Sequence, residues 1–459
     1  MSETVGVIWF RRDLRLADNP ALAEAADRHD RLVPVFVHDP ALIGPSGANR
    51  VAFLHACLDA LGADPDVDGH LVERHGDPAE VVAALAAEVG AEDVYAAEDF
   101  GPYGRRRDHA VRSRLEADGR TLHLVGTPYA VAPGTLHTKS GTPFQVFTPF
   151  SKAWRAHGWP DPIPVPAGLR WADGVSSHAR PATPSPTAAH GLPPAGEAAA
   201  HDVADRFLAH HVAHYRDRRD RPDVDGTSRL SPHLKLGTIH PRQLLHRLSD
   251  APGAATFASE LCWREFYADV LSNRPESARR NYAATMDGLE WDEGPTADER
   301  FDAWRQGRTG YPIVDAGMRQ LLAEGWMHNR VRMIVASFLV KDLHIDWRRG
   351  AAWFMEHLVD GDLASNSHGW QWTAGTGTDA APFFRVFNPT AQGQRFDPDG
   401  DYVRRYVPEL RDVAGPAVHT PHDLPPGDLF SASPAADYPA PIVDHRAERE
   451  EALARYGRR

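Results

Sequence analysis

Short apolar runs alternate with helix-like segments along the first 130 residues of the chain. The apolar, β-branched runs lie at 5–10, 32–38, 70–74, 93–97 and 121–125. The helix-like segments between them lie at 21–28, 48–61, 78–89 and 105–117. Strands that alternate with helices of this length indicate βαβ units and a parallel sheet. We therefore predict a doubly wound α/β domain over residues 1–130.

Local signals support this prediction and indicate where a ligand would bind. The dipeptides Asn19-Pro20 and Asp77-Pro78 are typical helix starts, an N-cap followed by proline. Neither G-x-G-x-x-G nor a P-loop motif follows the first run, so a dinucleotide or P-loop phosphate cradle is not indicated. Because ligands of such sheets bind at the carboxyl ends of strands, we look to the loops after Phe10, His38 and Asp99.

The pattern changes after residue 130. Prolines crowd between positions 160 and 194, which predicts an irregular connector over the surface. From residue 201 onward, helical periodicity with short Gly/Pro breaks predicts an all-α region. Its longest apolar run, 331–343, is too short to span a bilayer. We predict three regions, namely an α/β domain (1–130), a Pro-rich linker (131–200) and a helical domain (201–459).

Composition narrows the class of protein. The chain has 459 residues, of which 25% are charged and 42% hydrophobic, as in ordinary soluble proteins. Two cysteines, Cys57 and Cys262, exclude a disulfide framework and a CxxC metal site and suit a reducing cytosol. The N-terminus lacks a basic segment followed by a long apolar run, so we expect no signal peptide and a cytoplasmic location.

The net charge of −13 is unevenly distributed. Residues 1–130 carry 13 basic and 22 acidic side chains, which gives −9, and residues 287–302 add −6. The rest of the chain therefore totals +2. An acidic total is compatible with a local basic footprint for nucleic acid.

A candidate anion site precedes a helix that we predict from His233 to Gly237. The segment 226–232 combines a glycine, three hydroxyls and Arg229. Free N–H groups at a helix start, together with hydroxyls, bind phosphate. An N-cap rich in Ser and Thr also accounts for these residues.

Aromatic and charged residues are mixed in three later segments. Glu260, Trp263 and Arg264 fall within one helical turn, so they share a face of the helix. Such a face is either a solvated pair of charges held in place by a buried Trp, or a surface on which a base flipped out of DNA could stack. The segments 326–333 and 359–366 supply arginines and carboxylates, which suit either an Arg–Asp pair or the lining of a heteroaromatic ligand site.

Tryptophans are concentrated in the same part of the chain. Eight of the twelve lie between Trp263 and Trp372, a distribution that a helical core alone would also explain. Trp370 and Trp372 are two residues apart, so they face different directions on a helix. There is no G-x-S-x-G and no metal-ligand spacing among the histidines, so we expect neither a hydrolase nor a metal site.

Taken together, these segments resemble the photolyase/cryptochrome family. The resemblance rests on stretches that occur in order along the chain: WFRRDLRLADNPAL, DGTSRLSPHLKLG, LCWREFY, TGYPIVDAGMRQL, GWMHNRVRMIVASFLVKDLHIDWRRG and DGDLASNSHGWQWTAGTGTDAAPFFRVFNP. Within the family, the chain is most similar to bacterial class I cyclobutane pyrimidine dimer photolyases.

The resemblance implies a light-driven DNA-repair lyase. The α/β domain would hold an antenna pigment and the helical domain would hold FAD, active as FADH⁻. Light would drive electron transfer to a dimer flipped out of UV-damaged DNA, and the electron would return after the ring splits. The resemblance also implies a monomer with no obligate protein partner and no membrane association. The alternative is a blue-light receptor that signals through a partner.

The resemblance also assigns roles to residues. It places FAD against Tyr215, Thr227, Ser228, Arg229, Leu230, Ser231, Arg264, Arg332, Asp360, Asp362 and Asn366, the last opposite flavin N5. It places the dimer against Glu260, Trp263, Asn329, Met333 and Trp372, with Arg330 and Gln392 on the DNA side. It implies a photoreduction chain from Trp370 through Trp347 to Trp291, with Trp304 as the alternative outer position.

Two features discriminate within the family. The stretch MHNR at 327–330 lacks the His-His arrangement associated with (6-4) photolyases, which favours cyclobutane dimers, and the chain ends at Arg459 without the longer extension usual in signalling cryptochromes. Arg50, Asp99 and Lys235 resemble an 8-hydroxy-5-deazaflavin antenna site. Gly101 replaces an acidic residue usual there, so methenyltetrahydrofolate or no antenna remains open.

Overall fold

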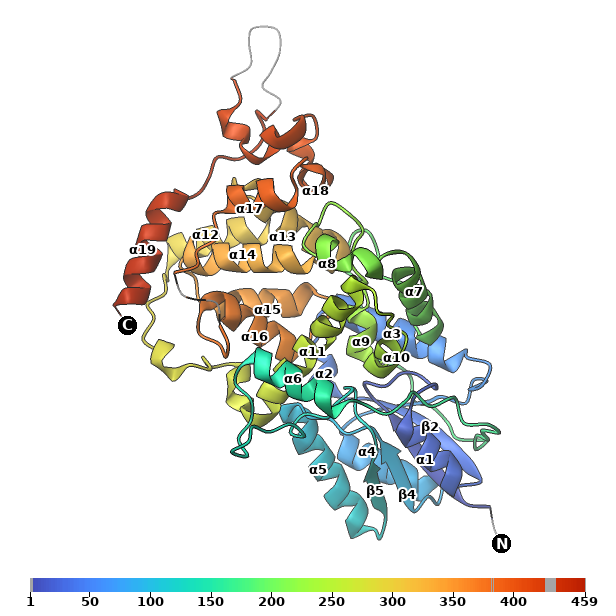
Figure 1. Cartoon of the computed structure of the whole chain (residues 1–459). Coiled ribbons are helices and arrows are strands. Elements are labelled where there is room, and N and C mark those ends of the chain that lie inside the picture. The colour runs from blue at the N-terminus through green and yellow to red at the C-terminus, as the bar shows by residue number, and fades with distance from the viewer. Residues whose placement is uncertain (1–2, 381, 383, 426–434, 459) are drawn as a thin grey trace. The chain divides into compact units, whose positions relative to one another are not determined.

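The chain forms two compact units, each assembled from separate stretches of sequence. The computed structural model describes residues 3–380, 382, 384–425 and 435–458 (Figure 1). The first unit comprises Met1–Ser185, Pro193–Ala213 and Ser228–Pro275, and the second comprises Pro186–Leu192, His214–Thr227 and Glu276–Arg459. The predicted division at residues 130 and 200 follows the sequence pattern instead, and it stays a prediction.

A parallel sheet forms the centre of the first unit, as predicted. Its strands lie in the order β3-β2-β1-β4-β5. Val7 in the middle strand pairs with Val33 on one side and Val94 on the other. The strands are β1 (Val5–Phe10), β2 (Arg31–His38), β3 (Val72–His75), β4 (Asp93–Ala96) and β5 (Thr121–Leu124).

Helices follow the strands at the places where the sequence pattern puts them. Asn19 and Asp77 cap their helices as expected, since their side chains accept hydrogen bonds from Leu22 N and Ala79 N. Two helices, α4 and α5, pack together, and Figure 1 shows them along one side of the sheet. The helices of this unit are α1 (Pro20–Arg28), α2 (Pro40–Ile43), α3 (Ala48–Gly62), α4 (Pro78–Glu88), α5 (Pro102–Ala117), α6 (Phe147–His157), α7 (Glu197–His210), α9 (Ser231–Leu236), α10 (Pro241–His246) and α11 (Pro252–Asn273).

A buried carboxylate holds the long helix α11 in the first unit. Glu265 is 1% exposed and accepts hydrogen bonds from Ala130 N (2.6 Å), Val131 N (3.0 Å) and Trp154 Nε1 (2.6 Å). Burial raises the pKa of this carboxyl, and the three donors oppose the shift because they favour the charged form. This contact fixes the helix that carries Glu260, Trp263 and Arg264.

The described residues of the second unit form helices and loops and contain no strand, in agreement with the predicted all-α region. One large core joins its helices and contains Trp304, Trp347 and Trp370. The apolar run at 331–343 becomes the buried helix α14. The helices are α8 (Tyr215–Arg218), α12 (Pro295–Arg305), α13 (Pro312–Glu324), α14 (Asn329–Lys341), α15 (Trp347–His357), α16 (Leu363–Ala374), α17 (Pro389–Phe396), α18 (Asp401–Tyr406) and α19 (His445–Gly457).

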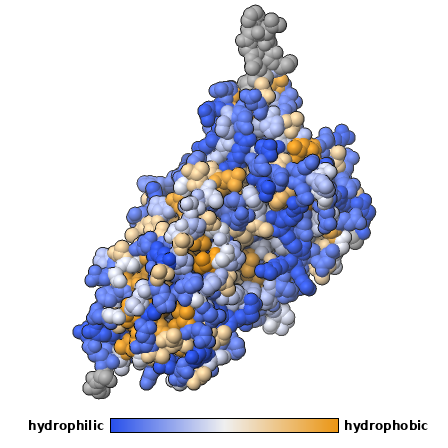
Figure 2. Space-filling view, turned by 180° about the vertical axis from the view of Figure 1, so that it is seen from behind, coloured by the Kyte–Doolittle hydropathy of each residue, from blue (hydrophilic) through white to orange (hydrophobic). Residues whose placement is uncertain are grey.

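The exposed surface is mixed in character. Figure 2 shows hydrophobic residues interspersed among hydrophilic ones on the face seen from behind. Within the described ranges, none of the helices has both the length and the apolar content that crossing a bilayer requires.

The Pro-rich connector is tied to the edge strand β3. Ser177 Oγ accepts a hydrogen bond from Glu73 N, and His178 N donates to Glu73 O. The Glu73 carboxylate binds Arg180 (2.5 Å) and His38 (2.6 Å). Burial raises the pKa of Glu73, but the hydrogen bonds from His38 and Arg180 outweigh burial and lower that pKa to about 2.

Glu73→Gln should therefore lower stability in a pH-dependent way. A depressed carboxyl pKa stabilises the fold above the unfolded-state pKa, and this stabilisation is lost as the pH falls through the folded-state value. We expect a loss of up to about 3 kcal/mol at pH 7 that shrinks between about pH 4.5 and pH 2. Urea unfolding from pH 7 to pH 3 measures it, with Glu116→Gln on the exposed side of α5 as the control. A Glu73→Gln deficit that stays constant over this range would contradict the assignment.

Candidate functional site

A buried ion pair connects α14 with the segment before α16. Arg332 Nη2 donates to Asp360 Oδ2 over 2.8 Å, and Arg332 Nε donates to Met327 O over 2.8 Å. The Asp360 side chain is 3% exposed and that of Arg332 is 25% exposed. The other carboxylate oxygen of Asp360, Oδ1, is buried and has no hydrogen-bond partner among the described residues. It is an acceptor positioned for a donor that the protein itself does not supply.

Two polar residues on the first turns of α16 extend this arrangement. Asp362 caps the helix by accepting a hydrogen bond from Ser365 N (3.1 Å). Asn366 Nδ2 donates to Ala351 O (2.9 Å), which holds the amide in place. Both side chains are half-buried and one turn apart, so they share a side of the helix. We call Arg332, Asp360, Asp362 and Asn366 the polar cluster.

The buried side of α16 is fixed by neutral hydrogen bonds. His368 Nδ1 donates to Ala364 O (2.8 Å), so its Nε2 accepts from Ser277 Oγ (3.0 Å). Burial lowers the pKa of His368 to about 4, which keeps the ring uncharged at neutral pH. Gln371 binds Ser277 O and Tyr282 N. These contacts set the rotation of the helix and hence the direction of its half-buried side.

Trp370 and Trp372 face different directions, as the sequence spacing predicts. Trp370 is 2% exposed and packs in the core, where a Cβ on Gly350 would overlap its ring. Trp372 is half-buried. Trp370 also follows Asn366 by one helical turn, so the first tryptophan of the predicted chain lies next to the polar cluster.

The other tryptophans of the predicted chain lie in the same unit. Trp347 is 1% exposed, and its Nε1 donates to Asn281 Oδ1 (2.9 Å). Trp291 is partly buried and packs against the core. Trp304 is 0% exposed, so it does not have the exposure that the outer position requires, whereas Trp291 does.

The predicted dimer residues of the second unit lie at the start of α14. Asn329 is exposed, and Met333, one turn later, is half-buried. Arg330 points to other partners, since it forms an ion pair with Asp220 (2.9 Å) and stacks over Phe396 (4.6 Å). Gln392 on α17 is half-buried.

In the first unit, α11 carries an aromatic surface. Trp263 stacks on Phe147 with ring centroids 3.7 Å apart and an angle of 7°, and Tyr267 lies 5.4 Å away. Glu260 is half-buried one turn earlier. Arg264 donates to the backbone carbonyls of Pro128 (3.1 Å) and Leu234 (2.9 Å), contacts that tie α11 to its neighbours.

The candidate phosphate segment is divided between the units. Tyr215 and Thr227 belong to the second unit, and Ser228, Arg229, Leu230 and Ser231 belong to the first. The helix that follows begins at Ser231, two residues earlier than predicted, because Pro232 fits the first turn of a helix. It ends at Gly237, as predicted, where a positive φ of 68° and the close approach of Arg12 O require glycine.

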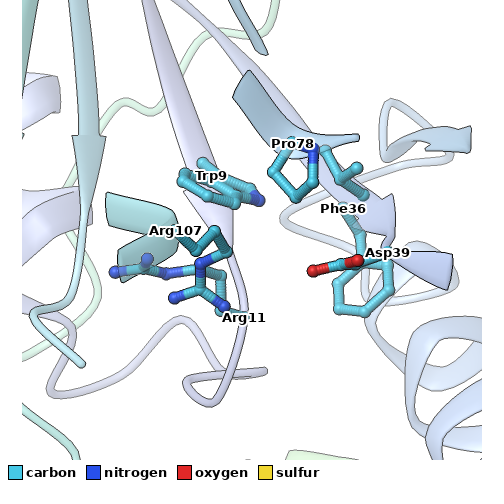
Figure 3. Close-up of a pocket in the computed structure, with 7 residues that line it drawn as sticks. Trp9, Arg11, Phe36, Asp39, Pro78 and Arg107 are labelled. Carbon is cyan, nitrogen blue, oxygen red and sulfur yellow. The ribbon is translucent and has the colours of Figure 1, made fainter. Parts of the chain in front are cut away.

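A pocket of about 60 Å³ opens at the carboxyl ends of the strands in the first unit (Figure 3). Arg11 and Arg107 stack over the Trp9 ring at 4.5 and 5.2 Å, and Tyr103 donates to Asp39 (2.5 Å). The pocket is lined by Trp9, Arg11, Phe36, Val37, Asp39, Pro78 and Arg107.

This pocket uses residues that the sequence analysis did not single out. Asp99 does not line it and pairs instead with Arg107 (3.4 Å) and Arg12 (3.8 Å). Arg50 and Lys235 are half-buried elsewhere in the same unit. The available signal was the position of Arg11 and Asp39, each the first residue after a predicted strand.

Comparisons with known proteins identify the family. Residues 6–167 match the family described as DNA photolyase, and residues 257–458 match the FAD binding domain of DNA photolyase. The chain is 43% identical to a deoxyribodipyrimidine photo-lyase from Halobacterium salinarum, over 98% of each chain. It is also 43% identical to a deoxyribodipyrimidine photo-lyase from Streptomyces griseus, over 99% of each.

A solved structure agrees with these matches. A bacterial class III photolyase from Agrobacterium tumefaciens superposes with a TM-score of 0.90 at 38% identity, over 100% of this chain and 98% of that one. Full-length similarity to enzymes of one kind, on the same fold, extends to the activity. The chain belongs to the DNA photolyase family and is a light-dependent, FAD-binding DNA-repair enzyme of the deoxyribodipyrimidine photo-lyase type.

Proposed function

We propose that this enzyme splits cyclobutane pyrimidine dimers, in the manner of class I photolyases, by electron transfer from photoexcited FADH⁻. The observation that carries the proposal is the arrangement around α16. Asp362 and Asn366 are half-buried one turn apart, Trp370 follows Asn366 by one turn and lies in the core, and the half-buried Trp372 faces another direction. One helix thus carries polar contacts for a flavin, a substrate-facing indole and an oxidisable core indole.

The polar cluster fits a flavin ring. The unpartnered Asp360 Oδ1 offers an acceptor to a ring N–H, and Arg332 donates to the other oxygen of the same carboxylate. Asn366 cannot donate a carboxylic proton, so a flavin nitrogen beside it is not protonated by this residue. When bound, the reduced flavin supplies the transferred electron. We assign the pyrophosphate and ribose contacts to Tyr215, Thr227, Ser228, Arg229, Leu230 and Ser231.

The dimer contacts that we propose lie on α11, α14 and α16. Glu260 would accept hydrogen bonds from thymine N–H groups, and the indoles of Trp263 and Trp372 would stack on a base. Asn329 and Met333 would complete the contacts, and Arg330 and Gln392 would face DNA. Asn329, in place of a His-His arrangement, favours the cyclobutane substrate over the (6-4) product. We further propose that the enzyme acts as a monomer.

Substrate choice is tested by repair in light and in darkness on cyclobutane and (6-4) substrates supplied separately. We expect light-dependent repair of the cyclobutane substrate only.

Trp372→Ala and Glu260→Ala should each weaken binding of dimer-containing DNA by about 10- to 100-fold, because each removes a stacking or hydrogen-bonding contact to the flipped base. Band-shift titration measures the affinity, with Trp353→Ala and Glu116→Ala as controls. Undiminished affinity in both site variants would contradict these dimer contacts.

Flavin binding tests the polar cluster. Asp360→Asn removes the charge that pairs with Arg332 and should weaken FAD binding by about 10- to 100-fold, the effect of losing a charge-assisted contact. The ratio of flavin to protein after dialysis, and fluorescence titration of the apoprotein, measure this loss. The control is Asp401→Asn, which breaks the surface pair with Arg404. Equal flavin loss in both variants would point to general destabilisation.

We propose that the pocket in Figure 3 belongs to an antenna site and that the antenna is an 8-hydroxy-5-deazaflavin, with a folate as the alternative. The acidic ring hydroxyl of a deazaflavin suits the two arginines, Arg11 and Arg107, and Trp9 and Phe36 offer aromatic contact. A cavity of about 60 Å³ takes an edge of such a ring system and not the whole of it. Asp99, Arg50 and Lys235 remain predicted contacts.

Pigment extraction tests this assignment. Protein made in a host that produces deazaflavin should release FAD and a second, near-UV-absorbing pigment that mass spectrometry identifies. Asp39→Ala should lower the content of the second pigment several-fold and leave the FAD content unchanged, because Asp39 lines this pocket and is not among the residues assigned to FAD. Asp118→Ala, on the surface after α5, is the control. A folate as the second pigment would overturn the deazaflavin assignment. A second pigment whose content is unaffected by Asp39→Ala would overturn the assignment of the pocket.

A further inference from the structure

Trp370 has a second indole neighbour besides the predicted route through Trp347. Trp304, on α12, lies with its ring centroid 6.1 Å from that of Trp370, at an angle of 70°. Phe354 contacts both indoles, at 5.0 Å from Trp370 and 6.4 Å from Trp304. The two indoles are therefore in edge-to-face proximity within one packed core.

The surroundings of Trp304 differ from those of a terminal electron donor. Its side chain is 0% exposed, and its Nε1–H donates to Val335 O over 3.0 Å. A backbone carbonyl is not a base, so an oxidised Trp304 cannot pass its proton to this partner. The Nε1–H of Trp370 has no acceptor among the described residues. Trp291, by contrast, is partly exposed, so an oxidised indole there can lose its proton to water.

We propose that Trp304 is a second, reversible electron donor to Trp370, on a side branch of the chain that leads through Trp347 to Trp291. The inference rests on the proposed photoreduction chain. Trp370 gives one electron to the photoexcited oxidised flavin, which is the oxidant. Trp304 then gives one electron to the oxidised Trp370. Trp370 returns to its neutral form, Trp304 becomes a radical cation, and no bond is made or broken.

Burial determines what this branch does. Trp304 retains its proton, so the oxidised state stays reversible and the electron can return. Because Trp370 and Trp304 are both buried indoles, the oxidised form is populated on each of them to a comparable extent. Sharing lowers the fraction of time for which Trp370 itself is oxidised, and this slows the return of the electron from the flavin. Because transfer onward to Trp347 also starts from oxidised Trp370, sharing slows that step by the same factor. The branch therefore stores the oxidised state without changing how it is divided between return and onward transfer.

Transient absorption of the flavin-loaded protein tests the branch. Trp347→Phe blocks the onward route and confines the oxidised state to Trp370 and Trp304. We expect the tryptophan radical to decay at least about twofold more slowly in Trp347→Phe than in the double variant Trp347→Phe/Trp304→Phe, because equal sharing halves the population on Trp370. Equal lifetimes in the single and double variants would overturn the branch.

Controls separate this outcome from a packing defect and from failure of the proposed chain. Trp353→Phe, in the Trp347→Phe background, removes an indole that lies against His357 (4.1 Å) and Arg305 (5.3 Å), and it should leave the lifetime unchanged. The melting temperature and flavin content report on the fold, and Trp304→Tyr replaces Trp304→Phe if the latter does not fold. If Trp370→Phe leaves photoreduction intact, the chain itself is wrong. If Trp370→Phe blocks it and the lifetimes agree, only the branch is wrong.

Discussion

The close approach of α15 and α16 at Gly350 is the constraint on which the functional side of the second unit depends. Any side chain at position 350 would overlap the Trp370 ring and Leu339. Because Trp370 is seated against this glycine, the rotation of α16 is restricted, and the side chains of Asp362, Asn366 and Trp372 are left half-buried. Core packing and site geometry are thus coupled at this contact, which acts together with the hydrogen bonds of His368 and Gln371, since a close-packed interior transmits displacement instead of absorbing it.

The polar cluster shows why such a site needs a well-packed frame. A carboxylate that is 3% exposed is stable only when it is paired, and Arg332 supplies that pairing through one oxygen of Asp360. The second oxygen has no partner among the described residues, which is costly in the protein alone and useful when a ligand donates to it. Residues that violate ordinary rules of burial concentrate at functional sites, and the surrounding core compensates for their cost.

Local signals predicted the elements well, and long-range contacts limited the rest. The strands and the N-caps at Asn19 and Asp77 follow from periodicity and capping chemistry, which act within a few residues. The assembly of the first unit from separate stretches of sequence depends on contacts such as Glu265 with Ala130, which are 135 residues apart and leave no local pattern. Candidate site residues could be proposed from the sequence where they lie in one contiguous motif, as in 359–372.

Side chains whose roles depend on tertiary burial could not be placed from sequence. The exposure of Trp304 and Trp291 is one example, because both lie in a polar, charged stretch of the chain and only packing shows that Trp304 is buried. Arg107 in the pocket is another, because it arrives from α5, distant in sequence from Trp9 and Asp39. The rule that ligands bind at the carboxyl ends of parallel strands identifies the loops that form a pocket, but it does not identify which helix supplies the remaining side chains of that pocket.

The acidic run at 287–302 gains a physical meaning from the position of Trp291 within it. Its formal charge is −6, and Glu290 and Asp292 flank the indole directly. Arginines from outside the run offset part of this charge, since Arg455 pairs with Asp292 (2.7 Å), Arg458 with Glu290 (3.9 Å) and Arg349 with Asp298 (2.8 Å). A negative field at the partly exposed end of the chain favours a positive charge on Trp291 over one on the buried indoles, because Coulomb energy rewards opposite charges even when solvent screens them. In the proposed chain, this local acidity would therefore favour withdrawal of the oxidised state from Trp370 and Trp304 toward Trp291, where proton loss to water would make the transfer irreversible.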